Sequence, residues 1–316
     1  MQKTLVTFTD PHIRMKTPQS RTDTNWLEQC LGQIEAVFAL ANKHKARAVL
    51  CSGDVGDGPA WSDRAIVGLW QILAEYRHIP FYTTVGQHDV RGHRIEEWHD
   101  SSLGLLSTLT RNPNKSGALD KYDLSGMVNV LEGGRSVKID GKVEIYGFGF
   151  NQPETIAFLE GKFPFDMDDT KFRIALVHAL VGPEDAMGWK GIEHQNLRGC
   201  QVASFGDVHC GFDSHEFPSG CVAYSTGSLT RSSLADIGRV PACAVIKINE
   251  DNSFELEHHE IPDGDDHVVF FTKEMVQLAR EHQDETPVNR VQRVGDSNGF
   301  TARQIALVVD RLETDK

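Results

Sequence analysis

The sequence predicts an α/β protein built as a four-layer α/β/β/α sandwich with a short C-terminal helical tail. Three observations favour this fold. The first half alternates short apolar runs with stretches of helical spacing, which is typical of parallel strands connected by helices. The second half is richer in apolar runs of strand length. A polar segment, "PDGDD" at 262–266, then separates these runs from the end of the chain.

The first half provides three strands and two helices. Strands are expected at 4–10 ("TLVTFTD"), 46–54 ("ARAVLCSGD") and 79–85 ("IPFYTTV"). Apolar residues recur with helical spacing over 25–44, and Ser62 stands as an N-cap residue before a second stretch of this kind. This βαβαβ order predicts a parallel sheet that helices cover on its two faces.

The second half contains a hairpin signal at Asp140-Gly141 and then five further strand-length runs. These runs occupy 172–179, 201–207, 221–228, 242–249 and 254–261. Because the turns between the last runs are short, we expect a second sheet with antiparallel pairs. We therefore expect one domain over 1–261 and a tail over 262–316, whose two short helices cap the domain or dock a partner.

Composition restricts the class of protein. The formal net charge of −13 argues against a broad basic surface for nucleic acid, although an enzyme with local contacts or with metal cations stays open. No run of about 18 apolar residues occurs, so no membrane span is expected. The N-terminus resembles a strand more than a signal peptide, and the six cysteines include no CxxC pair, so we expect a cytoplasmic protein with reduced thiols.

Residues of the kinds that bind metal ions stand at the ends of five expected strands. They are Asp10 and His12, Asp54, Gln87 and His88, His178, and Asp207 and His209. Alternate positions of an extended segment point to the same side, so each Asp-x-His pair converges. Since ligands gather outside the carboxyl ends of strands in open α/β sheets, we expect all of these side chains to form one cluster.

Aspartate, histidine and one amide oxygen, without a thiolate, make a borderline-hard ligand set. Such a set suits Mn²⁺, Fe or Zn²⁺. The ligands suffice for two ions, and two ions about 3.5–4 Å apart stabilise both the attacking and the leaving oxygen of a phosphoryl displacement. Asp54 is the expected bridging carboxylate.

In order, the motifs "DPH", "GDVGD", "GQHD", "VHA" and "GDVH" resemble those of the calcineurin-like metallophosphoesterase family over roughly residues 1–260. The resemblance implies metal-dependent phosphodiester hydrolysis by a two-metal mechanism. It implies two ligand sets: Asp10, His12, Asp54 and His209 for the first ion, and Asp54, Gln87, His178 and Asp207 for the second. It makes His88 the proton donor to the leaving oxygen or a group that stabilises the phosphoryl transition state.

Two positions depart from the family pattern, and both belong to the second metal position. Gln87 stands where asparagine is usual, and Asp207 stands where histidine is usual. A carboxylate is a harder ligand than an imidazole, so we expect this position to favour Mn²⁺ or Mg²⁺ over Zn²⁺. A partly lost second position with reduced activity is the alternative.

The segment "YSTGSLTRSS" at 224–233 is similar to a segment of SbcD-type nucleases, repair exonuclease subunits that act with an SMC-like ATPase. This resemblance implies DNA as the substrate, an SbcC-type ATPase as a partner, and a homodimer. The short tail suits a minimal, phage-like version of that group. Arg91, Ser228 and Arg231 are the expected phosphate contacts. A small-molecule phosphodiesterase or phosphatase, and a binding subunit with a degenerate site, are the alternatives.

Overall fold

The computed structural model describes residues 2–18, 21, 23–110, 126–165, 168, 170–185, 188–233, 236 and 239–263. The chain divides into two compact units. The first consists of Met1–Met15, Leu27–Thr230 and Val240–Asp263, and the second includes Lys16–Trp26 and Arg231–Arg239. The predicted helices of the tail lie outside the described residues, so the predicted boundary after residue 261 stays a prediction.

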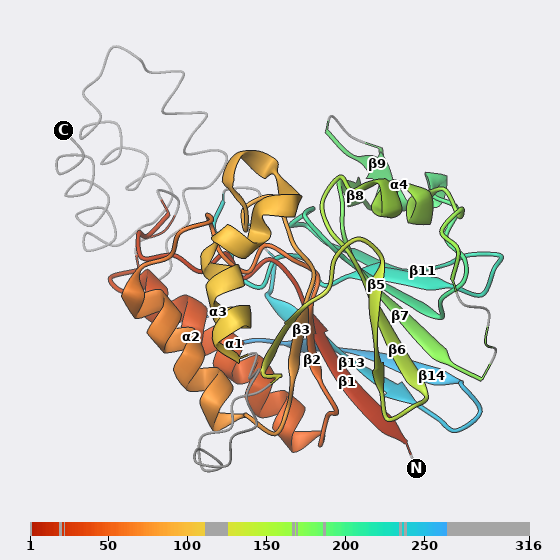
Figure 1. Cartoon of the computed structure of the whole chain (residues 1–316), viewed down its shortest axis with the longest axis horizontal. Coiled ribbons are helices and arrows are strands. Elements are labelled where there is room, and N and C mark those ends of the chain that lie inside the picture. The colour runs from red at the N-terminus through yellow and green to blue at the C-terminus, as the bar shows by residue number, and fades with distance from the viewer. Residues whose placement is uncertain are drawn as a thin grey trace, which may run out of the picture. The chain divides into compact units, whose positions relative to one another are not determined.

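The first sheet has six strands in the order β14-β13-β1-β2-β3-β4. Its parallel part consists of β1 (Lys3–Phe8), β2 (Val49–Cys51), β3 (Phe81–Thr83) and β4 (Val128–Val130). Beside β1, the sheet continues antiparallel through β13 (Ala242–Ile248) and β14 (Phe254–Glu260). Figure 1 shows these two blue strands next to the red β1, so the two ends of the first unit's sequence meet in one sheet.

The second sheet also has six strands, in the order β11-β12-β10-β7-β6-β5. Its four central strands are parallel: β6 (Val143–Phe148), β7 (Phe172–His178), β10 (Val202–Gly206) and β12 (Val222–Ser225). The antiparallel strands β5 (Arg135–Ile139) and β11 (Phe212–Glu216) form its edges. A separate pair consists of β8 (Val181–Gly182) and β9 (Lys190–Gly191).

Helices cover the outer face of each sheet (Figure 1), whereas the inner faces of the two sheets pack against each other. The prediction that helices cover both faces of the parallel sheet is therefore wrong. The first sheet packs against α1 (Trp26–Lys43), α2 (Asp63–Glu75) and α3 (Ser102–Thr110). The second packs against α4 (Pro153–Leu159). Among the described residues, the short 3₁₀ helices η1 (Arg91–His93) and η2 (Ile95–Asp100) follow β3, and η4 (Ile192–His194) follows β9.

The core forms three apolar layers because successive residues of a strand point to opposite faces. In β2, Val49 and Cys51 pack toward the helices, whereas Leu50 packs between the two sheets. In β7, Ile174 faces the first sheet and Ala175 faces the side that α4 covers. The predicted α/β/β/α sandwich is therefore confirmed.

Two local predictions are also confirmed. The Ser62 hydroxyl caps α2 by accepting the backbone N–H of Ala65 at 3.2 Å. Asp140 and Gly141 form the turn between β5 and β6 with φ values of 51° and 69°, as a hairpin turn of the I′ kind requires.

The predicted arrangement of the last strands is right in part: β11 with β12 and β13 with β14 form antiparallel pairs, as expected. We expected them to form the second sheet with antiparallel pairs, but β13 and β14 complete the first sheet and β10 and β12 lie parallel in the second. Short turns favour antiparallel pairing only between consecutive strands, and β12 and β13 do not pair. Among the described residues, no helix is both long enough and apolar enough to cross a membrane.

Candidate metal centre

The predicted ligands meet where parallel strands of both sheets end. Those that follow or end a strand of the first sheet are Asp10 and His12 after β1, Asp54 after β2, and Gln87 and His88 after β3. Those of the second sheet are His178 at the end of β7, and Asp207 and His209 after β10. The pairing of His178 with Gly206 aligns the ends of β7 and β10. The sheet order thus gathers residues from five strands at one edge.

Four of these residues have a left-handed backbone. The φ values are 50° for Asp10, 44° for His12, 49° for Asp54 and 90° for Asp207. Residues other than glycine rarely adopt positive φ, and such conformations concentrate at functional sites where the surrounding structure enforces them. Here they turn the chain sharply after each strand and direct the side chains into the cluster.

Two glycines allow the strand-end loops to approach one another closely. A Cβ atom at Gly86 would collide with the carboxylate and the backbone nitrogen of Asp54. Gly53 has a φ of 102°, and a Cβ atom there would collide with the ring of His178. Glycine at these positions therefore lets Asp54 and His178 lie in the same small volume.

One group of ligand atoms comes from Asp10, His12 and His209, whose candidate atoms lie within 4.8 Å of one another. The Nε2 atoms of the two histidines are 3.0 Å apart, and His12 Nε2 lies 3.8 Å from Asp10 Oδ1. The Thr9 hydroxyl donates to Asp10 Oδ2 at 2.5 Å and fixes that carboxylate. These three residues belong to the ligand set that the sequence predicts for the first metal ion. The fourth member of that set is Asp54.

Asp54 connects this group to His178 and His88. Asp54 Oδ2 lies 3.3 Å from His178 Nε2 and 4.0 Å from His88 Nε2. His178 Nδ1 lies 2.7 Å from the carbonyl oxygen of Ser52 and donates its proton there, so Nε2 of the neutral ring keeps its lone pair for a cation. Asp54, like Asp10 and His12, belongs to two of the three possible ligand groups in the described residues.

Gln87 and Asp207 also reach this side of the cluster. Gln87 Oε1 lies 2.7 Å from His178 Nε2, and Gln87 Nε2 donates to Asp207 Oδ1 at 2.6 Å. The backbone N–H of Asp207 lies 3.1 Å from Asp10 Oδ2, so Asp207 also contacts the first group. The structure therefore brings all predicted ligands together.

Several buried ligand atoms have no hydrogen-bond partner. These are His12 Nδ1, Asp54 Oδ2 and Asp207 Oδ2. A buried polar group without a partner costs about 1–3 kcal/mol, and more when it is charged. Two of the three atoms are carboxylate oxygens, whose negative charge a divalent cation would satisfy. The residues present thus fit bound metal ions.

Electrostatics separates the titrating groups. Burial raises the pKa of Asp10 to about 6, and the charges of His178 and His209 only partly oppose this. Burial acts in the same direction on Asp54, but its ion pair with His178 outweighs burial and lowers the pKa of Asp54. Burial disfavours the charged form of His178, yet Asp54, Asp10 and Asp207 raise the pKa of His178 well above its usual value. A cation at this position therefore competes with the proton of His178.

His88 and Asp89 have different environments although they are adjacent. The His88 side chain is 44% exposed, and its ring lies edge-on to that of His12 with centroids 5.0 Å apart. The Asp89 carboxylate is buried and accepts the backbone N–H groups of Gly56 and Gly86, each at 3.0 Å. Asp89 thus ties the loop of Asp54 to the loop of His88 and leaves His88 facing solvent.

The three residues predicted to contact phosphate differ in their exposure and in their hydrogen bonds. Arg91 is exposed in η1, just after the loop that carries His88, and its role stays a prediction. Arg231 belongs to the second compact unit, where its guanidinium donates to the carbonyl oxygen of Arg239 at 3.1 Å. Ser228 is fully buried, with its hydroxyl 2.8 Å from the carbonyl oxygen of Asp10, so its side chain does not face a substrate.

Ser228 instead braces the loop that holds Asp10. Its hydroxyl also lies 2.6 Å from the carbonyl oxygen of Thr230, whose own hydroxyl donates to that of Pro11 at 3.1 Å. The backbone N–H of Leu229 donates to the carbonyl oxygen of Thr9 at 2.8 Å. The segment 228–230 therefore runs beside 9–11 and fixes the first metal position.

Substitution of Ser228 with alanine tests this role. We expect the free energy of unfolding to fall by about 1–3 kcal/mol, because a buried carbonyl oxygen loses its donor. Urea unfolding measures the stability and Mn²⁺ titration measures the metal affinity. Both quantities should decrease. Ser214→Ala at an exposed position of β11 is the control. Reduced hydrolysis with unchanged stability and metal affinity would instead indicate a direct substrate contact.

Sequence reasoning left one neighbour of the cluster without a role. Asp57 Oδ2 accepts a hydrogen bond from Arg14 Nη1 at 2.5 Å, and Asp57 Oδ1 lies 3.7 Å from His12 Nδ1. Its position three residues after Asp54 in "GDVGD" indicated that Asp57 lies near the cluster. Only the fold shows that it faces the ring of His12.

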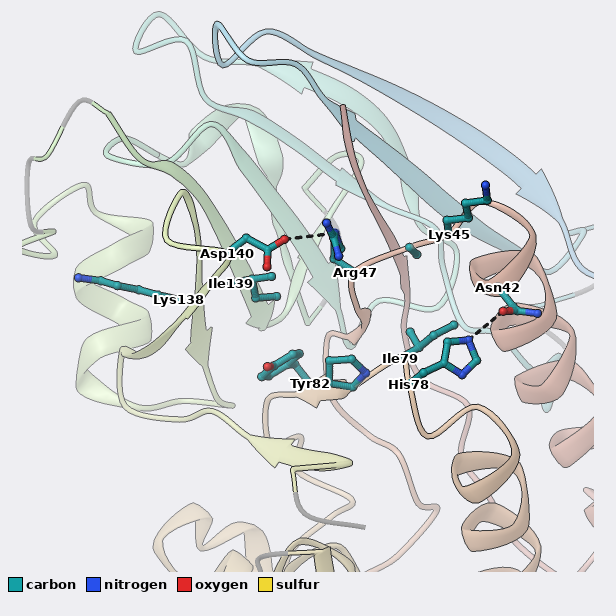
Figure 2. Close-up of a pocket in the computed structure, with 11 residues that line it drawn as sticks. Asn42, Lys45, Arg47, His78, Ile79, Tyr82, Lys138, Ile139 and Asp140 are labelled. Atoms are coloured by element: carbon teal, nitrogen blue, oxygen red, sulfur yellow. Dashed lines mark hydrogen bonds and ion pairs between the residues drawn. The ribbon is translucent and has the colours of Figure 1, made fainter. Parts of the chain in front are cut away.

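A cavity of about 470 Å³ lies at the opposite ends of β2 and β3, before these strands begin. Figure 2 shows Arg47 facing Asp140 across it, at 3.2 Å, and His78 facing Asn42, at 2.9 Å. In the same view, Lys138 points away from these pairs. Because the cavity is remote from the strand ends that carry the cluster, we do not assign it to the candidate metal centre.

The sequence model of the calcineurin-like phosphoesterase family matches residues 3–213. This range includes every candidate ligand described above. The chain therefore belongs to the calcineurin-like phosphoesterase family, and its cluster stands where the ordered motifs of the sequence predicted it.

Solved structures give further similarities. The protein TT1561 of Thermus thermophilus is 13% identical, with 83% of this chain and 100% of that chain covered and a TM-score of 0.47. A dimetal phosphatase from Danio rerio is 11% identical, with coverages of 85% and 99% and a TM-score of 0.49. The phosphoesterase YfkN from Bacillus subtilis is 14% identical, with coverages of 90% and 97% and a TM-score of 0.42. A search of curated proteins finds no match.

Proposed function

We propose that this protein is a nuclease of the SbcD type, which hydrolyses phosphodiester bonds of DNA with two divalent metal ions. The observation that carries the proposal is the buried cluster of carboxylates and imidazoles with ligand atoms that lack partners, beside the exposed imidazole of His88. Mn²⁺ is the ion that its mixed oxygen and nitrogen donors suit best, and Mg²⁺, Fe and Zn²⁺ are the alternatives.

The ligand sets follow the groups described above. Asp10, His12, Asp54 and His209 would hold the first ion, and Asp54, Gln87, His178 and Asp207 the second. When bound, the two ions supply positive charge that stabilises the attacking and leaving oxygens of the displaced phosphoryl group.

The protein's own contribution is to position a proton donor above the cluster. His88 Nε2 lies 4.0 Å from Asp54 Oδ2, and the backbone N–H of His88 donates to Asp54 Oδ1 at 2.8 Å. This hydrogen bond and the carboxylate of Asp89 hold the loop in place, so the imidazole would meet the leaving oxygen of a bound substrate from a fixed backbone. His88 would donate its proton to that oxygen as the bond breaks.

DNA is proposed as the substrate because "YSTGSLTRSS" and the early motifs are similar to those of SbcD-type nucleases. The net charge of −13 suits a subunit with local phosphate contacts, for which Arg91 and Arg231 are candidates. An SMC-like ATPase of the SbcC type, a homodimer and a cytoplasmic location belong to the same proposal.

A substrate panel tests the proposal. We expect the purified protein with Mn²⁺ to cleave linear duplex or single-stranded DNA and bis-p-nitrophenyl phosphate, and expect EDTA to abolish both reactions. Turnover of a phosphomonoester without cleavage of DNA would instead identify a phosphatase. If no substrate reacts although Mn²⁺ binds, the protein is a binding subunit, as the departures at Gln87 and Asp207 would allow.

A further inference from the structure

The two residues that depart from the family pattern bind each other. Gln87 and Asp207 are 120 positions apart in the sequence, yet Gln87 Nε2 donates to Asp207 Oδ1 at 2.6 Å. Both lie beside His178, whose Nε2 is 2.7 Å from Gln87 Oε1. The two departures are therefore in direct contact.

Their lengths are complementary. Glutamine places its amide one methylene further from the backbone than asparagine does, whereas aspartate is shorter than histidine. The longer amide therefore spans the gap that the shorter carboxylate leaves. Asp207 is held from its other side by its own backbone, because its N–H donates to the carboxylate of Asp10.

The hydrogen bond also determines which atoms face a cation. Because the Gln87 amide nitrogen is directed at Asp207, its oxygen is directed at His178 Nε2. His178 Nδ1 is engaged by the Ser52 carbonyl oxygen, which leaves Nε2 as the coordinating atom. Asp207 Oδ1 is engaged by the amide, whereas Oδ2 is buried and has no hydrogen-bond partner. An ion that replaced the contact between Gln87 Oε1 and His178 Nε2 would meet three donor atoms: an amide oxygen, an imidazole nitrogen and a carboxylate oxygen.

We propose that Gln87 and Asp207 form a coupled pair that sets the ion preference of the second metal position. The Gln87 amide and the Asp207 carboxylate orient each other. Asp207 and Asp54 together give the position two carboxylates, whereas the family pattern, with histidine in place of Asp207, has one. This donor set favours an ion that prefers oxygen, such as Mn²⁺, over Zn²⁺. The inference rests on the proposed two-metal function.

Single substitutions should break the pair and the double substitution should restore a working pair. In Gln87→Asn the shorter amide no longer reaches Asp207, and the carboxylate loses its donor. In Asp207→His the Gln87 amide loses its acceptor and faces an imidazole ring. The double variant combines a short amide with an imidazole and removes one negative charge, so it should bind a second ion again but prefer Zn²⁺.

Calorimetric titration of metal-free protein with Mn²⁺ and with Zn²⁺ tests the pair, and electron paramagnetic resonance of the Mn²⁺ complexes reports whether two ions lie close together. We expect wild type to bind two Mn²⁺ ions, and each single variant to bind the second about tenfold to a hundredfold more weakly, as loss of a hydrogen bond to a charged group implies. The double variant should lose less than the product of the two single losses. Its preference for Zn²⁺ over Mn²⁺ should rise about tenfold.

Controls separate this effect from general damage. Gln71→Asn on α2 and Asp213→His on β11 make the same chemical changes at exposed positions and should bind both ions like wild type. Gln87→Met keeps the length of the side chain without its donor, and should weaken the second Mn²⁺ as Gln87→Asn does. Thermal melting in EDTA verifies that each variant is folded. If Gln87→Asn does not fold, Gln87→Met replaces it in the comparison.

Three results would overturn the inference. If the losses of the single variants multiply in the double variant, the residues act independently. If Gln87→Asn and Gln87→Met leave the second Mn²⁺ affinity unchanged, Gln87 does not orient Asp207. In both cases wild type still binds two ions, and the proposed function stands. A wild-type protein that binds no Mn²⁺ contradicts the pair and the proposed function together.

Discussion

Replacement of Asp54 with asparagine is expected to abolish high-affinity Mn²⁺ binding at both positions and to abolish phosphodiester hydrolysis. Asp54 is buried and shares one candidate ligand group with His12 and another with His178, so in the proposed centre its charge would serve both ions. Removal of one partner from a buried charge pair costs about 3–5 kcal/mol, which corresponds to a loss in affinity of roughly 10²- to 10³-fold or more.

Calorimetry with Mn²⁺ and hydrolysis of bis-p-nitrophenyl phosphate measure this loss, with Asp213→Asn on the exposed face of β11 as the control. Asparagine keeps the oxygen that accepts the backbone N–H of His88, at 2.8 Å in the wild type, so the loop should persist. If Asp54→Asn loses only one of two ions, Asp54 belongs to a single metal position and does not bridge.

Replacement of His88 with alanine should have the opposite pattern: both ions stay bound, and hydrolysis of DNA falls by about 10²- to 10⁴-fold. The exposed imidazole contributes no atom to the core, so thermal stability should change little. The size of the loss should depend on the leaving group. A p-nitrophenolate ion leaves without a proton, so bis-p-nitrophenyl phosphate should be affected much less than DNA if His88 is a general acid.

Comparison of kcat for the two substrates in wild type and His88→Ala distinguishes the two roles of His88. Equal losses on both substrates would show that His88 stabilises the charge of the phosphoryl group and does not protonate the leaving oxygen. Loss of Mn²⁺ binding in His88→Ala would make His88 a ligand, in agreement with its inclusion in the group with His12 and Asp54.

Most of the cluster could be predicted because it depends on local rules. Asp10, Asp54 and Gln87 each follow a short apolar run, and a parallel sheet places the ends of such runs together. Glycine at Gly53 and Gly86 marks where the chain turns between strand and ligand. These features are encoded within a few residues of each ligand.

The remaining features depend on contacts between distant segments. The pairing of β13 with β1 joins residues about 240 positions apart in the chain, as between Lys3 and Ile248, and turn lengths carry no information about it. Ser228 was predicted to contact a phosphate from its neighbours in sequence, but the bridge between Thr9 and Ser228 buries it against the loop of Asp10. The contact between Gln87 and Asp207 is likewise visible only once both sheets are assembled.

Anomalous diffraction from crystals grown with Mn²⁺ tests the two-metal centre most directly. We predict two peaks, one among Asp10, His12 and His209 and one among Gln87, His178 and Asp207, with Asp54 between them. A map that shows no peak at either place would contradict the two-metal centre, whether or not Mn²⁺ binds elsewhere in the crystal.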